Sequence, residues 1–100
     1  MSDNQMPTMN RGPRVRNVVS RMVDGAAMVI PVERDARHKD SVYTLNEAGS
    51  RLWAMIEAGR KATELAGWLE AEYGLSADDA AADTEQFLTA LADEGLIELA

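Results

Sequence analysis

Two spacings of hydrophobic residues divide the chain into an N-terminal part and a C-terminal part. Near the N-terminus, residues 17–23 (NVVSRMV) and 26–32 (AAMVIPV) are short runs rich in Val, Ile and Met, which is typical of strands. Asp24 and Gly25 separate the two runs, and Asp-Gly favours a type I′ turn, in which both positions have positive φ. The pattern predicts a β-hairpin, with Pro31 near a strand end or an edge because proline cannot donate to the ladder.

A third short strand is predicted to lead directly into a helix. Val42, Tyr43 and Thr44 are β-branched or aromatic residues, and these types favour strands. Asn46 has the side chain of a good N-cap, because its oxygen can accept a hydrogen bond from the first turn. Apolar or small residues then recur at helical spacing, at Ala48, Leu52, Met55, Ile56 and Gly59.

Two further helices are predicted in the C-terminal part. The first spans about 62–73 and ends at Gly74, since glycine accepts the left-handed conformation that closes helices. The second spans about 77–94, and Ser76 with Asp79 resembles a capping box at its start. Its inward positions are expected to be Ala80, Thr84, Phe87, Leu88 and Leu91.

Three short strands followed by three helices predict a small α+β domain. We expect an antiparallel sheet beside a winged helix-turn-helix-like arrangement, with the sheet as an enlarged wing. Residues 1–13 are polar and contain two prolines and a glycine, so they are interpreted as a disordered N-terminal segment, and 14–100 as the domain. Gly95 is expected to end the last helix, and residues 96–99 (LIEL) to form either an apolar plug or a short strand.

Charge is distributed unevenly along the sequence. The net charge is −7, every Lys and Arg lies at or before Lys61, and residues 62–100 carry only acidic charges. An acidic C-terminal part of this kind repels phosphate backbones and attracts a cationic partner. Alternatively, acidic helices simply keep a domain soluble. The chain shows no secretory signal and no apolar run near the roughly 20 residues that span a bilayer. We therefore expect a cytoplasmic protein without a membrane partner.

No group of residues indicates catalysis. The chain has no cysteine, and His38 is its only histidine; we interpret it as a solvated loop residue, because a metal site needs several convergent ligands. The serines have no base placed beside them, and the glycines form no phosphate-binding loop. The sequence therefore predicts no enzyme activity, no cofactor and no metal site.

A few polar and aromatic residues allow more than one interpretation. The acidic pairs 78–79 and 93–94 are either parts of a solvated face or docking points for a basic side chain. Trp53 and Trp68 are expected in the core, because aromatic side chains dominate core burial. Phe87 lies at the edge of the inward stripe, so it faces either the core or the third strand.

The predicted fold is compatible with two functions from different classes. A winged helix-turn-helix shape is typical of DNA-binding regulators, but the third predicted helix carries six acids and no Lys or Arg. DNA recognition needs cations for phosphates and base edges. The alternative is a peptide-binding module, in which the free edge of the third strand accepts an extended peptide as one more strand. The charge distribution favours peptide binding and no nucleic-acid partner.

An ordered set of residues runs through the predicted domain. It comprises Leu45-Asn46-Glu47-Ala48-Gly49, Leu52-Trp53, Gly59, Glu64-Leu65, Leu69, Tyr73, Asp83, Phe87-Leu88, Leu91 and Gly95-Leu96. Over about residues 18–99 this set resembles the PqqD family, whose members assist pyrroloquinoline quinone (PQQ) biosynthesis or, more widely, recognise ribosomally synthesised and post-translationally modified peptides (RiPPs). The chain departs from the family pattern at Ala58-Gly59, where Asp-Gly is usual, and at Lys61, where Thr often begins the second helix.

The resemblance implies a fold, a partner and a set of site residues. It implies a non-catalytic peptide chaperone that binds the leader of a precursor peptide as a strand between the third strand and the third helix. The partner enzyme would be a radical S-adenosylmethionine (SAM) maturase or another RiPP-modifying enzyme. By position, the implied site residues are Val42, Tyr43, Thr44 and Leu45 in the ladder, and Asp83, Phe87, Ala90 and Glu94 in the helical wall. An exposed edge can also pair two copies, so we expect a monomer or a weak homodimer.

Overall fold

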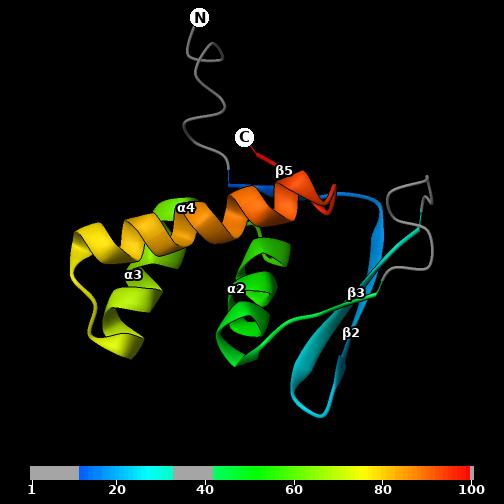
Figure 1. Ribbon diagram of the computed structural model, residues 1–100, viewed down its shortest axis with the longest axis horizontal. Coiled ribbons are helices and arrows are strands. Elements are labelled where there is room, and N and C mark those ends of the chain that lie inside the picture. Colours follow the sequence, from blue (N-terminus) through cyan, green and yellow to red (C-terminus); the bar gives the residue numbers. More distant parts are fainter. Residues whose placement is uncertain (1–11, 33–41, 100) are drawn as a thin grey trace, which may run out of the picture.

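The computed structural model describes residues 12–32 and 42–99. The described elements are β1 (Arg14–Val15), β2 (Val18–Val23), β3 (Ala26–Pro31), β4 (Tyr43–Thr44), α2 (Glu47–Glu57), α3 (Ala62–Tyr73), α4 (Ala77–Asp93) and β5 (Ile97–Glu98). Strands β2, β3 and β4 form an antiparallel sheet in that order, and β1 pairs antiparallel with β5. Figure 1 shows the larger sheet at one side of the helices, with α4 passing across α2 and α3. The expected α+β class is confirmed; the pair β1–β5 is an addition to it.

The hairpin has the predicted turn. Asp24 and Gly25 have φ values of 53° and 83°, as a type I′ turn requires. Pro31 is the last residue of β3, at the strand end where its missing donor does least harm. Beyond the assigned strand ends, the Val32 amide donates to the Asn17 carbonyl at 3.0 Å, so the pairing reaches the limits predicted from the sequence.

Helices α2 and α4 begin with the side-chain caps that the sequence predicts. The Asn46 oxygen accepts from the Gly49 amide at 2.7 Å, and the Ser76 hydroxyl accepts from the Asp79 amide at 3.1 Å. Each cap satisfies one of the amide donors that a first turn leaves without an intrahelical partner.

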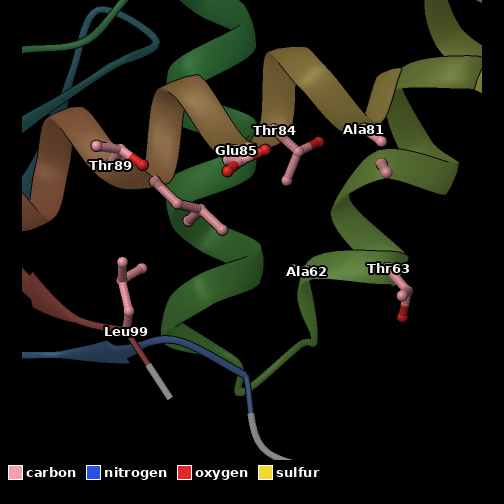
Figure 2. Close-up of a pocket in the computed structure, with 9 residues that line it drawn as sticks. Ala62, Thr63, Ala81, Thr84, Glu85, Thr89 and Leu99 are labelled. Atoms are coloured by element: carbon pink, nitrogen blue, oxygen red, sulfur yellow. The ribbon is translucent and has the colours of Figure 1, made fainter. Parts of the chain in front are cut away.

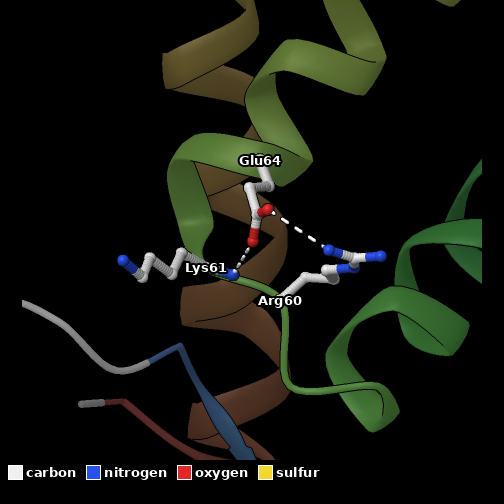
Figure 3. A network of polar contacts seen from close by, with 3 residues as sticks. All are labelled: Arg60, Lys61 and Glu64. Carbon is white, nitrogen blue, oxygen red and sulfur yellow. Dashed lines mark hydrogen bonds and ion pairs between the residues drawn. The ribbon is translucent and has the colours of Figure 1, made fainter.

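Helix α3 is held at its start by a different residue. The Lys61 side chain has no acceptor atom, so it gives no side-chain cap where the family pattern has Thr. Instead, Glu64 accepts from the Lys61 backbone amide at 2.9 Å, and its other oxygen lies 3.4 Å from the Arg60 guanidinium (Figure 3). The backbone hydrogen bond from Lys61, aided by the charges of Arg60 and Lys61, lowers the pKa of Glu64 below its usual 4.5, although partial desolvation opposes the shift.

The hydrophobic core lies between the larger sheet and the three helices. Its buried members are Ala27, Val29, Leu52, Trp53, Ile56, Leu65, Leu69, Ala80, Leu88, Leu91, Leu96 and Ile97. Trp53 is buried as predicted. Trp68 is only half-buried; its ring makes an edge contact with Tyr73 at 5.8 Å between centroids, and the Arg51 guanidinium lies 5.8 Å from the ring centroid. Trp68 therefore packs at the periphery of the core.

Both chain ends of the described domain are packed. Gly12 and Pro13 are buried, and a Cβ on Gly12 would lie 2.0 Å from the Arg60 carbonyl oxygen, so the packed part includes two residues that the sequence assigned to the N-terminal segment. The segment 96–99 takes the short-strand alternative: β5 pairs with β1, and the Arg16 amide donates to the Leu96 carbonyl at 2.9 Å. Residues 1–11 and the loop with His38 lie outside the described residues.

Within residues 12–32 and 42–99, no helix combines the length and the apolar character needed to cross a membrane.

Candidate functional site

Strand β4 lies at the end of the three-stranded sheet. In the described part of the chain it pairs with β3, through Met28 with Thr44 and Val29 with Tyr43. The sheet therefore has an outer edge at β4, where an added strand would continue the order β2-β3-β4.

The register determines which backbone groups point to that edge. The Leu45 amide donates to the Ala27 carbonyl at 2.9 Å, which marks these two residues as a hydrogen-bonded pair. Hydrogen-bonded and non-hydrogen-bonded pairs alternate along an antiparallel ladder. Tyr43 therefore directs its amide and carbonyl toward Val29, and Thr44 directs both groups away from β3 to the outer edge.

Ser50 completes the connection between β3 and β4 from the first turn of α2. Its hydroxyl accepts from the Ala27 amide at 2.8 Å and donates to the Leu45 carbonyl at 3.2 Å. The side chain is 3% exposed, so this hydroxyl replaces the direct bond from Ala27 to Leu45 in a buried place. The result is that β4 is fixed at once to β3 and to the N-terminus of α2.

A trough of about 390 Å³ lies between β4, the start of α2, and α4. Residues from β4 and its extension form one wall, α4 forms the facing wall, and α2 with α3 supplies the rest. The lining residues are Thr44, Leu45, Asn46, Ala48, Gly49, Leu52, Leu69, Asp83 and Phe87. The trough thus runs beside the sheet edge, where the side chains of an added strand would be placed.

The structure brings together six of the eight residues implied by the resemblance. Thr44 and Leu45 line the trough opposite Asp83 and Phe87. The Tyr43 hydroxyl donates to the Glu94 carboxylate at 2.8 Å, so this pair joins β4 to the far end of α4.

Val42 and Ala90 are the other two residues. Both are exposed, and neither lines the trough. Ala90 lies three residues after Phe87, so it is on the same side of α4.

Phe87 belongs to the trough as well as to the edge of the core. It is half-buried and packs against the core cluster, and its ring lies close to Gly49 of α2. A Cβ at Gly49 would be 3.3 Å from a Phe87 ring carbon and 3.1 Å from the Asn46 side-chain oxygen. Glycine at this position therefore lets the aromatic ring and the helix cap approach the same turn.

Five lining residues were not predicted as site residues: Asn46, Ala48, Gly49, Leu52 and Leu69. The sequence assigned Asn46 correctly as a cap, and it assigned Ala48, Leu52 and Leu69 to helix packing. A sequence signal for this part of the trough was available at the start of the helix, where two small residues, Ala48 and Gly49, follow one another. Small side chains leave room for a neighbouring group.

The charges of the site oppose a nucleic-acid function. Helix α4, the third described helix and the one that a DNA-binding winged helix-turn-helix protein would use for recognition, contains no Lys or Arg. Asp83 lines the trough, and Glu94, just after α4, accepts a hydrogen bond from the Tyr43 hydroxyl. Since phosphate contacts require cations, the site does not fit a DNA backbone.

The fold and the trough together assign the protein to a class: small α+β domains in which an edge strand faces a helix across a trough of side-chain size. The chain belongs to the PqqD family: the family model for coenzyme PQQ synthesis protein D matches residues 27–97. This match confirms the resemblance derived from the sequence. A comparison with curated protein sequences finds no match.

Two solved structures share the fold. TbiB1, solved in complex with the TbiA(beta) leader peptide, has a TM-score of 0.75 and 27% identity over 85% of this chain and 94% of that one. A lasso peptide synthetase B1, complexed with its leader peptide, has a TM-score of 0.73 and 19% identity over 85% of this chain and 95% of that one. Both neighbours are proteins that hold a leader peptide.

Proposed function

We propose that this protein is a non-catalytic peptide chaperone that binds the leader of a ribosomally synthesised precursor peptide. The leader adds as a strand at the outer edge of β4 and places its side chains in the trough between β4 and α4. The observation that supports this most directly is the trough itself, which lies beside the sheet edge and is lined from both sides by Thr44, Leu45, Asp83 and Phe87. Family membership and the leader-bound state of the two structural neighbours support the same function.

The ladder alone is too weak to explain useful binding. Thr44 offers one donor and one acceptor to an incoming strand, and the same alternation gives Val42 the same two groups. Four hydrogen bonds at about 1 kcal/mol net each supply about half of the roughly 8 kcal/mol that micromolar binding requires. The trough must supply the remainder by burying two or three apolar side chains, at about 1.5–3 kcal/mol each before ordering costs.

The bound leader would be delivered to a second protein that modifies the precursor. We propose a radical SAM maturase or another RiPP-modifying enzyme as that partner, in the cytoplasm where the precursor is made. The chaperone would contribute binding and orientation, and the enzyme would contribute the chemistry.

An NMR titration with a synthetic leader from a neighbouring precursor gene tests the proposal. Amide shifts should concentrate in residues 42–45 and 83–94, with a Kd of micromolar order. Shifts confined to the basic residues Arg14, Arg16 and Arg21 would contradict the proposed site. The matched control is the same leader with its residues in scrambled order, which keeps composition and charge.

A further inference from the structure

Strand β2 lies at the other end of the three-stranded sheet and gives it the longer of its two edges. It spans Val18–Val23 and pairs with β3 in the described part of the chain, whereas β4 spans only Tyr43–Thr44. Figure 1 shows the β2–β3 hairpin at one side of the molecule, with α2 between it and α3. The proposed leader site uses the edge at β4, so the edge at β2 has no role in it.

The register of the hairpin determines which backbone groups of β2 point away from the sheet. The Val32 amide donates to the Asn17 carbonyl at 3.0 Å, which marks these two residues as a hydrogen-bonded pair. Because hydrogen-bonded and non-hydrogen-bonded pairs alternate, every second residue of β2, starting with Val19, bonds to β3. The residues between them direct their amide and carbonyl groups away from β3, and these are Val18, Ser20 and Met22.

Exposed hydrophobic side chains gather on the same strand. Val19, Met22 and Val23 are 46%, 62% and 42% exposed. Leu99 is also exposed, but it lines a separate pocket of about 300 Å³ between α3 and α4, where Figure 2 shows it at the opposite end from Thr63. Neither this pocket nor the trough contains a residue of β2. An extended peptide at the β2 edge would therefore gain a ladder without a channel for its side chains.

A second copy of β2 is complementary to this edge in both its backbone and its side chains. In an antiparallel pair centred on Ser20, Ser20 lies opposite Ser20 of the second copy, and Val18 lies opposite Met22 of the second copy. The outward groups of both strands then meet in hydrogen-bonded pairs. Opposite side chains lie on the same face and touch, so the exposed Met22 packs against an apolar neighbour. Such an interface uses the same surface on both copies, as two-fold symmetry requires.

The charges of the strand favour this register over the neighbouring one. A pair centred on Arg21 would place two guanidinium groups directly opposite each other, which is destabilising. In the pair centred on Ser20, Arg21 lies opposite Val19 of the second copy instead. Each Ser20 hydroxyl keeps its hydrogen bond to Glu57 of its own chain, at 2.5 Å. The two Glu57 carboxylates lie on the helix side of the joined sheet and repel each other, so we expect a weak dimer and not an obligate one.

We propose that this chain forms a symmetric dimer through β2, which joins two three-stranded sheets into one continuous sheet. The strand order is β4-β3-β2-β2-β3-β4, so the outer edge of each β4 stays open at the two ends. Three hydrogen-bonded pairs supply about six ladder bonds, which at the net value used above for the leader ladder correspond to a Kd of about 10–100 μM. This inference goes beyond the proposed leader binding and does not depend on it.

A proline at the centre of β2 tests the edge. Sedimentation equilibrium of the purified full chain, from about tenfold below to about tenfold above this Kd, measures the dimer affinity. Ser20→Pro removes an outward amide, at an edge position where proline is tolerated. Ser20→Ala is the matched control, because it also loses the hydroxyl but keeps the amide. We expect Ser20→Pro to weaken the dimer at least tenfold relative to Ser20→Ala, since the symmetry removes two ladder bonds at once.

A pair of charge substitutions tests the register. Val19→Glu and Val23→Glu each place a carboxylate two residues from Arg21, on the same face of the same strand and at an exposed position, so effects within one chain are shared. Only Val19→Glu faces Arg21 of the second copy. Because opposite charges directly across a ladder are stabilising, we expect the Val19→Glu dimer to be at least threefold tighter than the Val23→Glu dimer.

Four results would overturn the dimer through β2. They are a chain that stays monomeric over the whole concentration range, equal dimer affinities of natively folded Ser20→Pro and Ser20→Ala, a Val23→Glu dimer as tight as that of Val19→Glu, and a dimer that the leader dissociates. The last result would assign the pairing to β4. If Ser20→Pro does not fold, as judged by circular dichroism, the comparison of the two charge variants decides. Failure of the leader to bind is read from a separate titration, and it would refute the chaperone function and not the dimer.

Discussion

Replacing Ser50 with alanine should destabilise the domain more than the loss of one ordinary hydrogen bond. The Ser50 hydroxyl is the only partner that the described hydrogen bonds give to the buried Ala27 amide, which it holds at 2.8 Å, and it also donates to the Leu45 carbonyl at 3.2 Å. Ala27 is 1% exposed, so water cannot replace the lost acceptor. An unsatisfied buried backbone group costs about 1–3 kcal/mol.

The expected loss for Ser50→Ala is about 2–4 kcal/mol, since the amide of Ala27 loses a short bond and the Leu45 carbonyl a longer one. For a domain of this size, about 1 kcal/mol shifts Tm by about 4–8 °C. Ser50→Ala should therefore lower Tm by about 8–30 °C and lower the urea midpoint, without a change in the slope m. Because the Leu45 amide lies in the same ladder, its hydrogen exchange should also accelerate.

Ser76→Ala is the matched control for this experiment. It also removes a serine hydroxyl that accepts from a backbone amide, but the Asp79 amide is exposed and water can take over. A lost cap of this kind costs about 1 kcal/mol, or about 4–8 °C. A Ser50→Ala variant no less stable than Ser76→Ala would refute the bridging role assigned to Ser50.

Three further predictions concern the trough and the start of α3. Phe87→Ala should weaken leader binding at least tenfold in a calorimetric titration, while the variant still unfolds cooperatively. The control is Leu88→Ala at the next residue, which is 6% exposed and should cost about 2–5 kcal/mol of stability. An unfolded Phe87→Ala variant would show that Phe87 is a core residue instead. Thr44→Pro should weaken leader binding about fivefold, because it removes one outward-facing amide donor worth about 1 kcal/mol. Thr44→Val keeps this amide and should retain the ladder contact. Equal leader affinities of the two variants would mean that the ladder forms elsewhere. Glu64 has a lowered pKa in the folded protein. Its ionised form therefore contributes stability above about pH 4.5, and this stability is lost as the pH falls through the folded-state pKa. The Tm difference between the unmodified chain and Glu64→Gln should shrink from pH 7 to pH 3, and a constant difference would contradict this prediction.

The parts of the fold that were predictable from sequence depend on local chemistry. Asp24-Gly25 specifies its turn through two positive φ values, and Asn46 and Ser76 cap their helices with their own side chains. Signals of this kind act within three or four residues, so they can be read without knowledge of the packing. The start of α3 differs from the family pattern, since Lys61 stands where Thr is common and gives no side-chain cap. Glu64, three residues later, accepts a hydrogen bond from the Lys61 backbone amide instead.

The parts that were not predicted depend on contacts between distant residues. Strand β1 has two residues, too few for a period-two pattern. A short strand at 96–99 was one of two alternatives, but its pairing with β1, which joins the two ends of the described domain, was not predicted. The role of Ser50 likewise depends on how α2 meets β3 and β4. Four residues implied by the family pattern, Thr44, Leu45, Asp83 and Phe87, lie around the trough, and their role in binding stays a prediction. Gly49 and Leu69 line the trough because α2, α3 and α4 converge there.

The shortness of β4 bears on how a leader would be selected. A long, flat edge strand pairs with any extended chain and is prone to aggregation. Strand β4, by contrast, spans only Tyr43–Thr44, and within it only Thr44 directs its backbone amide and carbonyl to the outer edge. Such an edge gives too few hydrogen bonds for sequence-independent capture. In the proposed binding mode, recognition would therefore depend on peptide side chains that enter the trough next to Phe87 and Gly49, so the trough rather than the ladder would determine which peptide is held.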